Sequence, residues 1–266
     1  MQDALPTDVP CVRCFYNLRG LMPSGACPEC GLSIASSLDP SRLVFADPRW
    51  RHDLARAIDL LYRALPTLPL VLMLLPVAFW PYLWTGRGAG VVIFRALFLS
   101  VLALGALVAV VGCLRVTARE PGAGVAAAPE VELWLARVGA VGYWAATIAL
   151  MLLPRVGVRF PAESSELGGV LMFVLLCVAA IGLLGRLRRL ALRLPDPALA
   201  RGLLRDAVIV AVAGALIAVL SHRVLPTGGR FPALRLIAGL ILLAGVWVNV
   251  RRFRHAQRRL APPPSP

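Results

Sequence analysis

The chain has 266 residues, of which 59% are hydrophobic and 16% charged, and its mean hydropathy is +0.76. A soluble domain has roughly 45–50% apolar and about 25% charged residues. The composition therefore excludes an ordinary cytosolic enzyme, a disordered chain and a disulfide-rich secreted module. The formal net charge is +14, and all 28 basic residues are arginine. These values predict an integral membrane protein, in which lipid solvates the apolar surface.

The first 31 residues, called the head below, carry the clearest chemical pattern. Two C-x-x-C pairs, Cys11/Cys14 and Cys27/Cys30, are separated by twelve residues. Each pair presents two thiolates from one tight turn, and together they offer four soft ligands that suit tetrahedral Zn²⁺. Because so short a segment has almost no core, we expect the metal to supply its folding energy. A complete shell of four cysteines leaves no open coordination position, which predicts a structural and not a hydrolytic role.

The compartment of the head follows from the character of residues 1–30, which are polar and lack the apolar stretch of a secretory signal. We therefore expect the head to stay in the reducing cytoplasm, where paired C-x-x-C patterns favour metal binding over disulfides. Iron is the alternative metal, because rubredoxin-like electron carriers use a similar cysteine spacing. Phe15 stands where those modules usually have Gly, which favours zinc.

The head also resembles a known class of proteins. The motif runs Cys11-x-x-Cys14-x-Tyr16-x-Leu18-Arg19-Gly20-Leu21 and then Cys27-Pro28-Glu29-Cys30-Gly31. It is similar to the N-terminal zinc ribbon of a large set of uncharacterised bacterial multi-span membrane proteins, and the likeness covers 21 residues. In that family Gly usually occupies the position of Phe15. The resemblance implies a zinc-binding head on a membrane body and carries no established activity.

The charge of the head bears on its partners. Two arginines stand against Asp3, Asp8 and Glu29, so residues 1–31 have a net charge of −1. This segment lacks the basic footprint that phosphate contacts require, and we expect no nucleic-acid binding. Phe15 and Tyr16 have rings that can stack on bases, but packing over the metal site is the use that we expect. A cytoplasmic protein partner is the better prediction for the head.

Residues 32–64 are expected to form a linker and then an amphipathic helix over 50–64. In that helix Leu54, Ile58, Leu61 and Leu65 recur at three- and four-residue spacing, with charged residues between them. The same pattern also fits the first turns of a first membrane-spanning helix.

Residues 65–250 are predicted to form an all-α transmembrane domain of about six helices in three hairpins. The expected spans are 65–84, 96–114, 133–153, 167–185, 206–225 and 233–250. Each is near the ~20 residues that cross ~30 Å of hydrocarbon. Arg137 and Arg235 lie near helix ends, where a long side chain can reach the interface. Small residues at four-residue spacing predict close helix approach: Gly105/Ala109, Gly142/Ala146, Ala211/Ala215 and Gly214/Ala218.

Orientation follows from the arginines. Twenty of the 28 fall in the segment before the first span, the second and fourth loops, and the basic, Pro-rich tail over 251–266. The positive-inside rule then predicts a multi-pass protein of the cytoplasmic (inner) membrane with both termini in the cytoplasm. We also expect the tail to contact anionic lipid.

No ionisable residue lies near the middle of any expected span, so the sequence offers no candidate catalytic residue. The leading hypothesis is a non-catalytic membrane protein whose zinc head serves as a protein-interaction or regulatory module. A transporter or channel with a regulatory zinc head is the first alternative, because Pro76 predicts a kinked first span. A rubredoxin-like membrane electron carrier is the second.

Overall fold

The fold is all-helical, as the sequence predicts. The computed structural model describes residues 3–39, 42–43, 46–85, 89–120, 131–152, 162–194, 197–223 and 231–258. Over these residues the chain forms six long helices and one short 3₁₀ helix, η1 (Ile34–Ser37), with isolated bridges in place of strands. The end of the predicted tail, 259–266, and at least part of each loop between the long helices lie outside the described residues.

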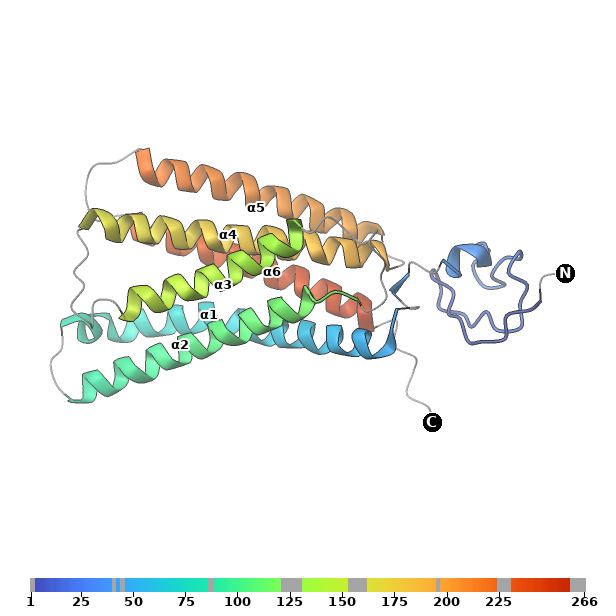
Figure 1. Ribbon diagram of the computed structural model, residues 1–266, viewed down its shortest axis with the longest axis horizontal. Helices are drawn as coiled ribbons and strands as arrows, with labels where there is room; N and C mark the ends of the chain where they lie inside the picture. Colours follow the sequence, from blue (N-terminus) through green and yellow to red (C-terminus); the bar gives the residue numbers. More distant parts are fainter. Residues whose placement is uncertain are drawn as a thin grey trace.

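The long helices run side by side as an elongated bundle, and the first of them begins at the end of the bundle where the last one ends (Figure 1). They are α1 (Pro48–Thr85), α2 (Ala89–Val116), α3 (Val131–Leu152), α4 (Ala162–Leu192), α5 (Pro197–Arg223) and α6 (Phe231–Arg258). Each expected apolar segment falls on one of these helices, apart from residues 153, 224 and 225, which are not described. We call the end where α1 begins, and beyond which the head lies in Figure 1, the head-side end.

Helix α1 includes residues 50–64, for which the sequence allowed either a separate amphipathic helix or the first turns of a spanning helix. Asp47 caps it, with its carboxylate accepting the backbone N–H of Trp50 at 2.7 Å, and Pro48 occupies the first turn. Leu54, Ile58 and Leu61 are at most 2% exposed and pack in the main core. The stretch 50–64 is therefore the start of α1 inside the bundle and not a separate surface helix.

Five helices form a closed ring. Along it α1 packs on α2, α2 on α3, α3 on α4, α4 on α6, and α6 again on α1. Helix α5 packs against α4 and α6 from outside this ring. Near its head-side end the ring is tightly filled, and Val116, Leu187, Val250 and Phe253 there have no exposed surface.

Helices α3 and α4 approach each other closely at two glycines. A Cβ atom added at Gly182 would lie 2.2 Å from the backbone N of Ala136, and one added at Gly139 would lie 2.4 Å from that of Ala179. Since real Cβ contacts are essentially never shorter than 3.0 Å, both positions require glycine.

Helix α6 continues as far as Arg258, into the segment expected to be a tail. Arg254 pairs with Asp59 of α1 and lies 4.3 Å above the Tyr62 ring, which stacks on Trp247 at 5.6 Å. The first turns of the basic segment 251–258 are thus fixed against α1 by charge and aromatic contacts.

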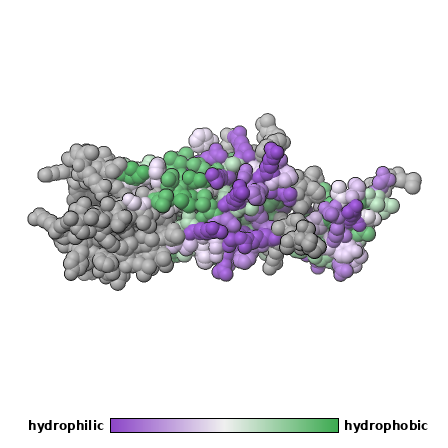
Figure 2. Space-filling view, turned by 90° about the horizontal axis from the view of Figure 1, so that it is seen from below, coloured by the Kyte–Doolittle hydropathy of each residue, from purple (hydrophilic) through white to green (hydrophobic). Residues whose placement is uncertain are grey.

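The surface of the bundle is divided by polarity. Figure 2 shows a hydrophobic zone on the bundle next to a broad hydrophilic zone toward the head. Among the described residues, one helical stretch, Val170–Leu192, is long and apolar enough to cross a bilayer, with a mean hydropathy of 2.5. Leu104–Val116 is a shorter apolar stretch.

Candidate metal centre

The two cysteine pairs lie in matching turns. The backbone N–H of Phe15 donates to the carbonyl of Cys11 at 2.9 Å, and that of Gly31 donates to the carbonyl of Cys27 at 2.8 Å. Each bond closes one C-x-x-C loop, so that both sulfur atoms of a pair leave the loop on the same side. The short spacing of the motif thus builds each half of the centre locally.

The residue after each pair has a left-handed backbone, with φ of 65° at Phe15 and 70° at Gly31. Glycine adopts this conformation without steric cost, whereas for a residue with a Cβ it costs about 1–2 kcal/mol. Phe15 nevertheless keeps the turn hydrogen bond. The departure from the usual Gly therefore leaves the shape of the first turn intact and adds backbone strain.

The structure brings all four predicted cysteine ligands together. Sγ of Cys11 lies 3.6 Å from Sγ of Cys30, Sγ of Cys14 lies 3.5 Å from that of Cys27, and all four sulfurs are within 4.8 Å of one another. A tetrahedron with Zn–S bonds of about 2.3 Å has edges of about 3.8 Å. The donor set and its dimensions therefore fit a tetrahedral metal ion such as zinc.

The thiols differ in acidity. Burial would raise the pKa of Cys11, but backbone N–H groups of Cys14 and Arg13 and the neighbouring thiols lower it to about 6. At Cys14 the backbone N–H of Tyr16 lowers the pKa, yet burial and the three other thiols together raise it to about 12. At Cys30 the backbone N–H of Leu32 and the Cys14 thiol lower the pKa, but burial and the thiols of Cys11 and Cys27 outweigh them and raise it. Thiolates this close together repel one another, and a bound dication would offset this repulsion.

The packed part of the head extends beyond Gly31. Its small core contains Val9, Leu18 and Ile34, all at most 5% exposed, and the η1 residue Ser37 accepts the backbone N–H of Val12 at 3.3 Å. Phe15 and Tyr16, which were expected to pack over the metal site, are each 41% exposed, so a large part of both residues faces solvent.

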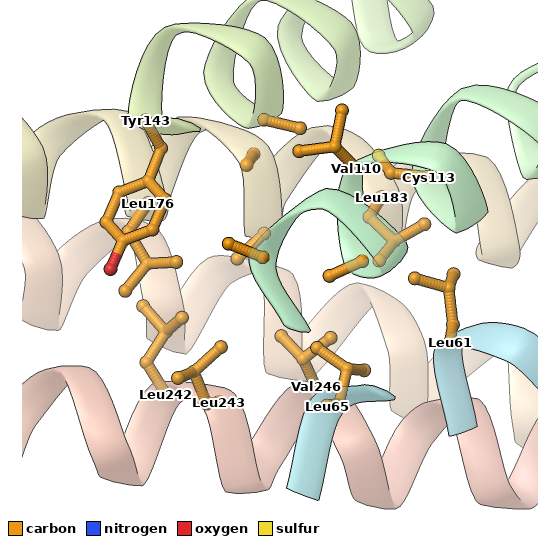
Figure 3. A pocket seen from close by; sticks show the side chains of 15 residues that line it. Leu61, Leu65, Val110, Cys113, Tyr143, Leu176, Leu183, Leu242, Leu243 and Val246 are labelled. Carbon is orange, nitrogen blue, oxygen red and sulfur yellow. The ribbon is translucent and has the colours of Figure 1, made fainter. Parts of the chain in front are cut away.

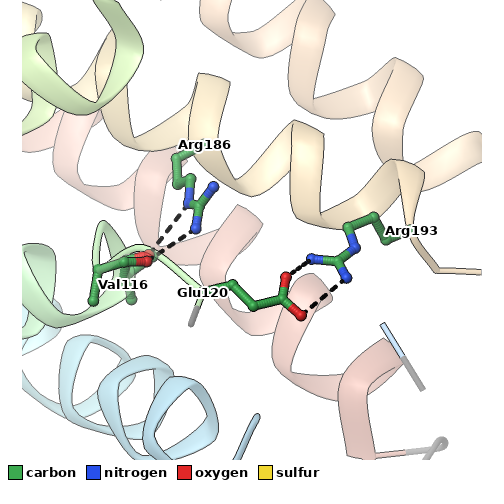
Figure 4. Close-up of polar contacts among 5 residues, drawn as sticks. Val116, Glu120, Arg186 and Arg193 are labelled. Carbon is green, nitrogen blue, oxygen red and sulfur yellow. Dashed lines mark hydrogen bonds and ion pairs between the residues drawn. The ribbon is translucent and has the colours of Figure 1, made fainter. Parts of the chain in front are cut away.

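Arginines form the second polar feature, at the head-side end of the bundle (Figure 4). Arg186 of α4 donates to the carbonyls of Val116 and Ala118 at the end of α2, at 3.4 and 3.1 Å. Arg193 pairs with Glu120 at 2.6 Å. These side chains cap α2 and bind α4 to it.

Arg137 of α3 joins this arrangement. It donates to the hydroxyl and the carbonyl of Thr117 at 3.0 and 2.7 Å, so its guanidinium binds the end of α2. From the sequence, Arg186 and Arg193 were expected only to signal topology. Their seven-residue spacing, with Arg189 between, places them on one helix face and was the available signal.

The remaining cysteines lie apart from the centre. Cys113 and Cys177 are buried in the bundle, and the Cys113 thiol lies 3.6 Å from the carbonyl of Ala136. Within the described ranges, the four head cysteines are the group of His, Cys, Asp or Glu side chains found close enough together to hold an ion.

Fold and site together define an all-helical protein with a small N-terminal module that can hold a metal ion in a cluster of four cysteines. No protein-family model, curated protein or solved structure matches the chain. The metal centre and the distribution of apolar and charged surface are therefore the features that bear on its function.

Proposed function

We propose that this chain is a non-catalytic, multi-span protein of the cytoplasmic membrane whose head holds structural Zn²⁺ and serves as a cytoplasmic protein-interaction module. This description agrees with the class of zinc-ribbon membrane proteins that the head motif resembles. The observation that carries the proposal is the combination of a four-cysteine cluster with a bundle that exposes large apolar side chains.

The apolar surface supports lipid as the solvent of the bundle. Large apolar side chains on different helices are more than half exposed, including Trp134 of α3 at 63%, Val212 of α5 at 63% and Ile241 of α6 at 68%. Soluble monomers rarely expose contiguous apolar patches larger than a few hundred Å². In a bilayer these side chains carry no hydration penalty, and six spans accommodate all of them.

The charged surface supports a cytoplasmic location for the head-side end. The exposed arginines there include Arg115, Arg201, Arg205, Arg251 and Arg252. Arginines beside an anionic bilayer contribute about 1 kcal/mol each, which agrees with anionic lipid as a partner of the basic end of α6. The head, by contrast, has a net charge of −1, and a Zn²⁺ ion in four thiolates adds −2. The same lipid therefore repels the head and leaves it free for a protein partner.

The head has the surface expected of a small interaction module. Phe15, Tyr16 and Met22 are 41%, 41% and 55% exposed, and aromatic residues and Met are enriched in protein interfaces. The head is also held close to the bundle: Leu38 packs on the head core, and Leu43 is 2% exposed in the bundle, where its N–H donates to the carbonyl of Arg193 at 3.1 Å.

Membrane location is tested by fractionation and by fusions. Wild-type protein is expected to resist alkaline carbonate extraction, and reporters fused at both ends should be active only in the cytoplasm. Protein that stays dissolved without detergent, or an amino end in the periplasm, would refute the proposal.

Metal identity is tested by elemental analysis of the purified chain. We expect about one zinc per chain, lost in Cys27→Ser/Cys30→Ser and retained in the matched control Cys177→Ser, whose thiol lies in the bundle. Iron in place of zinc, with visible colour, would favour the electron carrier instead.

The interaction role is tested by crosslinking in cells followed by purification. Partners recovered with wild type and Cys177→Ser should be lost both with the double cysteine variant and with Phe15→Ala/Tyr16→Ala, which keeps the metal. Identical partners in all four samples would show that the head is not the binding module.

A further inference from the structure

We infer that the interior of the five-helix ring is a binding site for a single hydrocarbon chain of a membrane lipid. Inside the ring lies a partly open cavity whose lining is almost entirely apolar. Apolar cavities between the helices of a bundle are common ligand sites. The lining comes from α1, α2, α3, α4 and α6, which are the five helices of the ring (Figure 3). This site lies in the bundle and goes beyond the role proposed for the head.

The side chains that line the cavity favour a hydrocarbon ligand. Its larger side chains are aliphatic, such as Leu65, Leu183 and Val246, and alanines on α2, α3 and α4 leave the space between them. Cys113 and Tyr143 are its polar side chains, at opposite ends in Figure 3. An ion or a sugar would lose its hydration here without compensating hydrogen bonds.

The cavity is closed toward the head. One turn beyond Leu61, Cys113, Leu183 and Val246 of its lining, the same four helices place a second set of aliphatic side chains, each at most 1% exposed: Ile58, Val116, Leu187 and Val250. This packed layer leaves no room for a passage along the ring axis. The cavity is therefore a blind-ended pocket, which weighs against a channel through the ring.

The level of the cavity along the bundle indicates what occupies it. Leu104 and Leu107, on the same turns of α2 as the lining residue Ala106, are 61% and 40% exposed, and Ile241 of α6 is 68% exposed beside the lining residue Leu242. If the proposed membrane location holds, acyl chains surround the ring at this level. An apolar cavity of this kind stays free of water, and a methylene chain restores the dispersion contacts that its walls lack.

Acyl chains and isoprenoid chains share this chemistry, and native mass spectrometry separates them by the mass of the bound molecule. The full chain, purified in mild detergent, should retain one such lipid. After delipidation it should immobilise stearic acid that carries a nitroxide near its methyl end, as measured by electron paramagnetic resonance.

The matched variants are Ala109→Phe, which fills the cavity from α2, and Ala215→Phe, which adds the same ring to the exposed face of α5 outside the ring. We expect Ala109→Phe to lower the bound fraction of both lipid and spin label at least tenfold and Ala215→Phe to leave it unchanged. If Ala109→Phe does not fold, Ala140→Leu narrows the same cavity from α3 and should reduce binding in the same way.

Two results would overturn the inference. One is a folded cavity-filling variant that retains lipid and spin label as wild type does. The other is delipidated wild type that fails to immobilise the label. Both outcomes are separable from failure of the membrane proposal, because fractionation and zinc content are read independently of the cavity variants.

Discussion

The crossing of α3 and α4 provides the most demanding test of the fold. Gly182→Ala adds one methyl group that would lie 2.2 Å from the backbone N of Ala136 and 2.8 Å from the carbonyl oxygen of Glu132. Ordinary van der Waals contact begins at 3.4 Å, so the two helices must separate locally by about 1.2 Å.

The cost follows from that separation. A radial gap near 1 Å removes roughly a quarter to a half of the dispersion energy of the atoms across it, and overpacking of a buried contact typically costs about 1–3 kcal/mol. Alanine also has a higher helix propensity than glycine, by about 0.8–1.0 kcal/mol. Gly245→Ala in α6 is the matched control, because nothing lies within 4 Å of its added Cβ. The same propensity gain applies to both variants, so their difference isolates the contact.

We expect the free energy of unfolding of Gly182→Ala to be about 1–3 kcal/mol lower than that of Gly245→Ala. The assay is reversible unfolding of both proteins in mixed dodecyl maltoside and dodecyl sulfate micelles. Adding Ala136→Gly should not restore Gly182→Ala, because the obstructing atoms are backbone. Equal shifts for Gly182→Ala and Gly245→Ala would show that α3 and α4 do not meet backbone to backbone.

Three further predictions concern the head and the helix ends. Phe15→Gly should remove the strain of the left-handed backbone at this position, although glycine also gives the unfolded chain more freedom, which offsets part of the gain in stability. We therefore expect zinc binding to tighten about two- to fivefold in a chelator competition. Weaker binding would show that the backbone at Phe15 is not strained. Since the pKa of Cys14 is about 12 and that of Cys30 is also raised, both thiols carry protons at pH 7 and must release them to the metal. Zinc affinity should then fall as the pH is lowered, by at least about 100-fold per pH unit, and calorimetry in buffers of different ionisation enthalpy should detect at least two released protons; a pH-independent affinity would exclude this coupling. Arg137→Leu leaves the carbonyl of Thr117 without its donor and should lower stability by about 1–3 kcal/mol in the micelle assay; an unchanged midpoint would mean that water or lipid satisfies this carbonyl equally well.

Several features were predictable because they depend on neighbours within a few residues. A C-x-x-C turn needs only four residues to aim two sulfurs, so Cys11, Cys14, Cys27 and Cys30 were identified from spacing alone. The helical class follows in the same way from long apolar segments without strand alternation.

Other features depended on contacts between distant parts of the chain. The small-residue pairs chosen from spacing did not include Gly139 or Gly182. Ala and Gly are so common in these helices that spacing alone does not identify the positions at which two helices touch. Arg137 was expected to extend toward the interface, and only the position of α2 shows that it caps Thr117.

Composition and spacing thus determined by themselves that this chain forms apolar helices behind a head with four clustered thiols. The tertiary structure decided that five of those helices form a ring around a cavity, with α5 outside, and that α4 binds α2 through its arginines. The physical reason is that a helix and a cysteine turn are stabilised by local bonds, whereas the choice of helix partners rests on shape complementarity across long sequence separations.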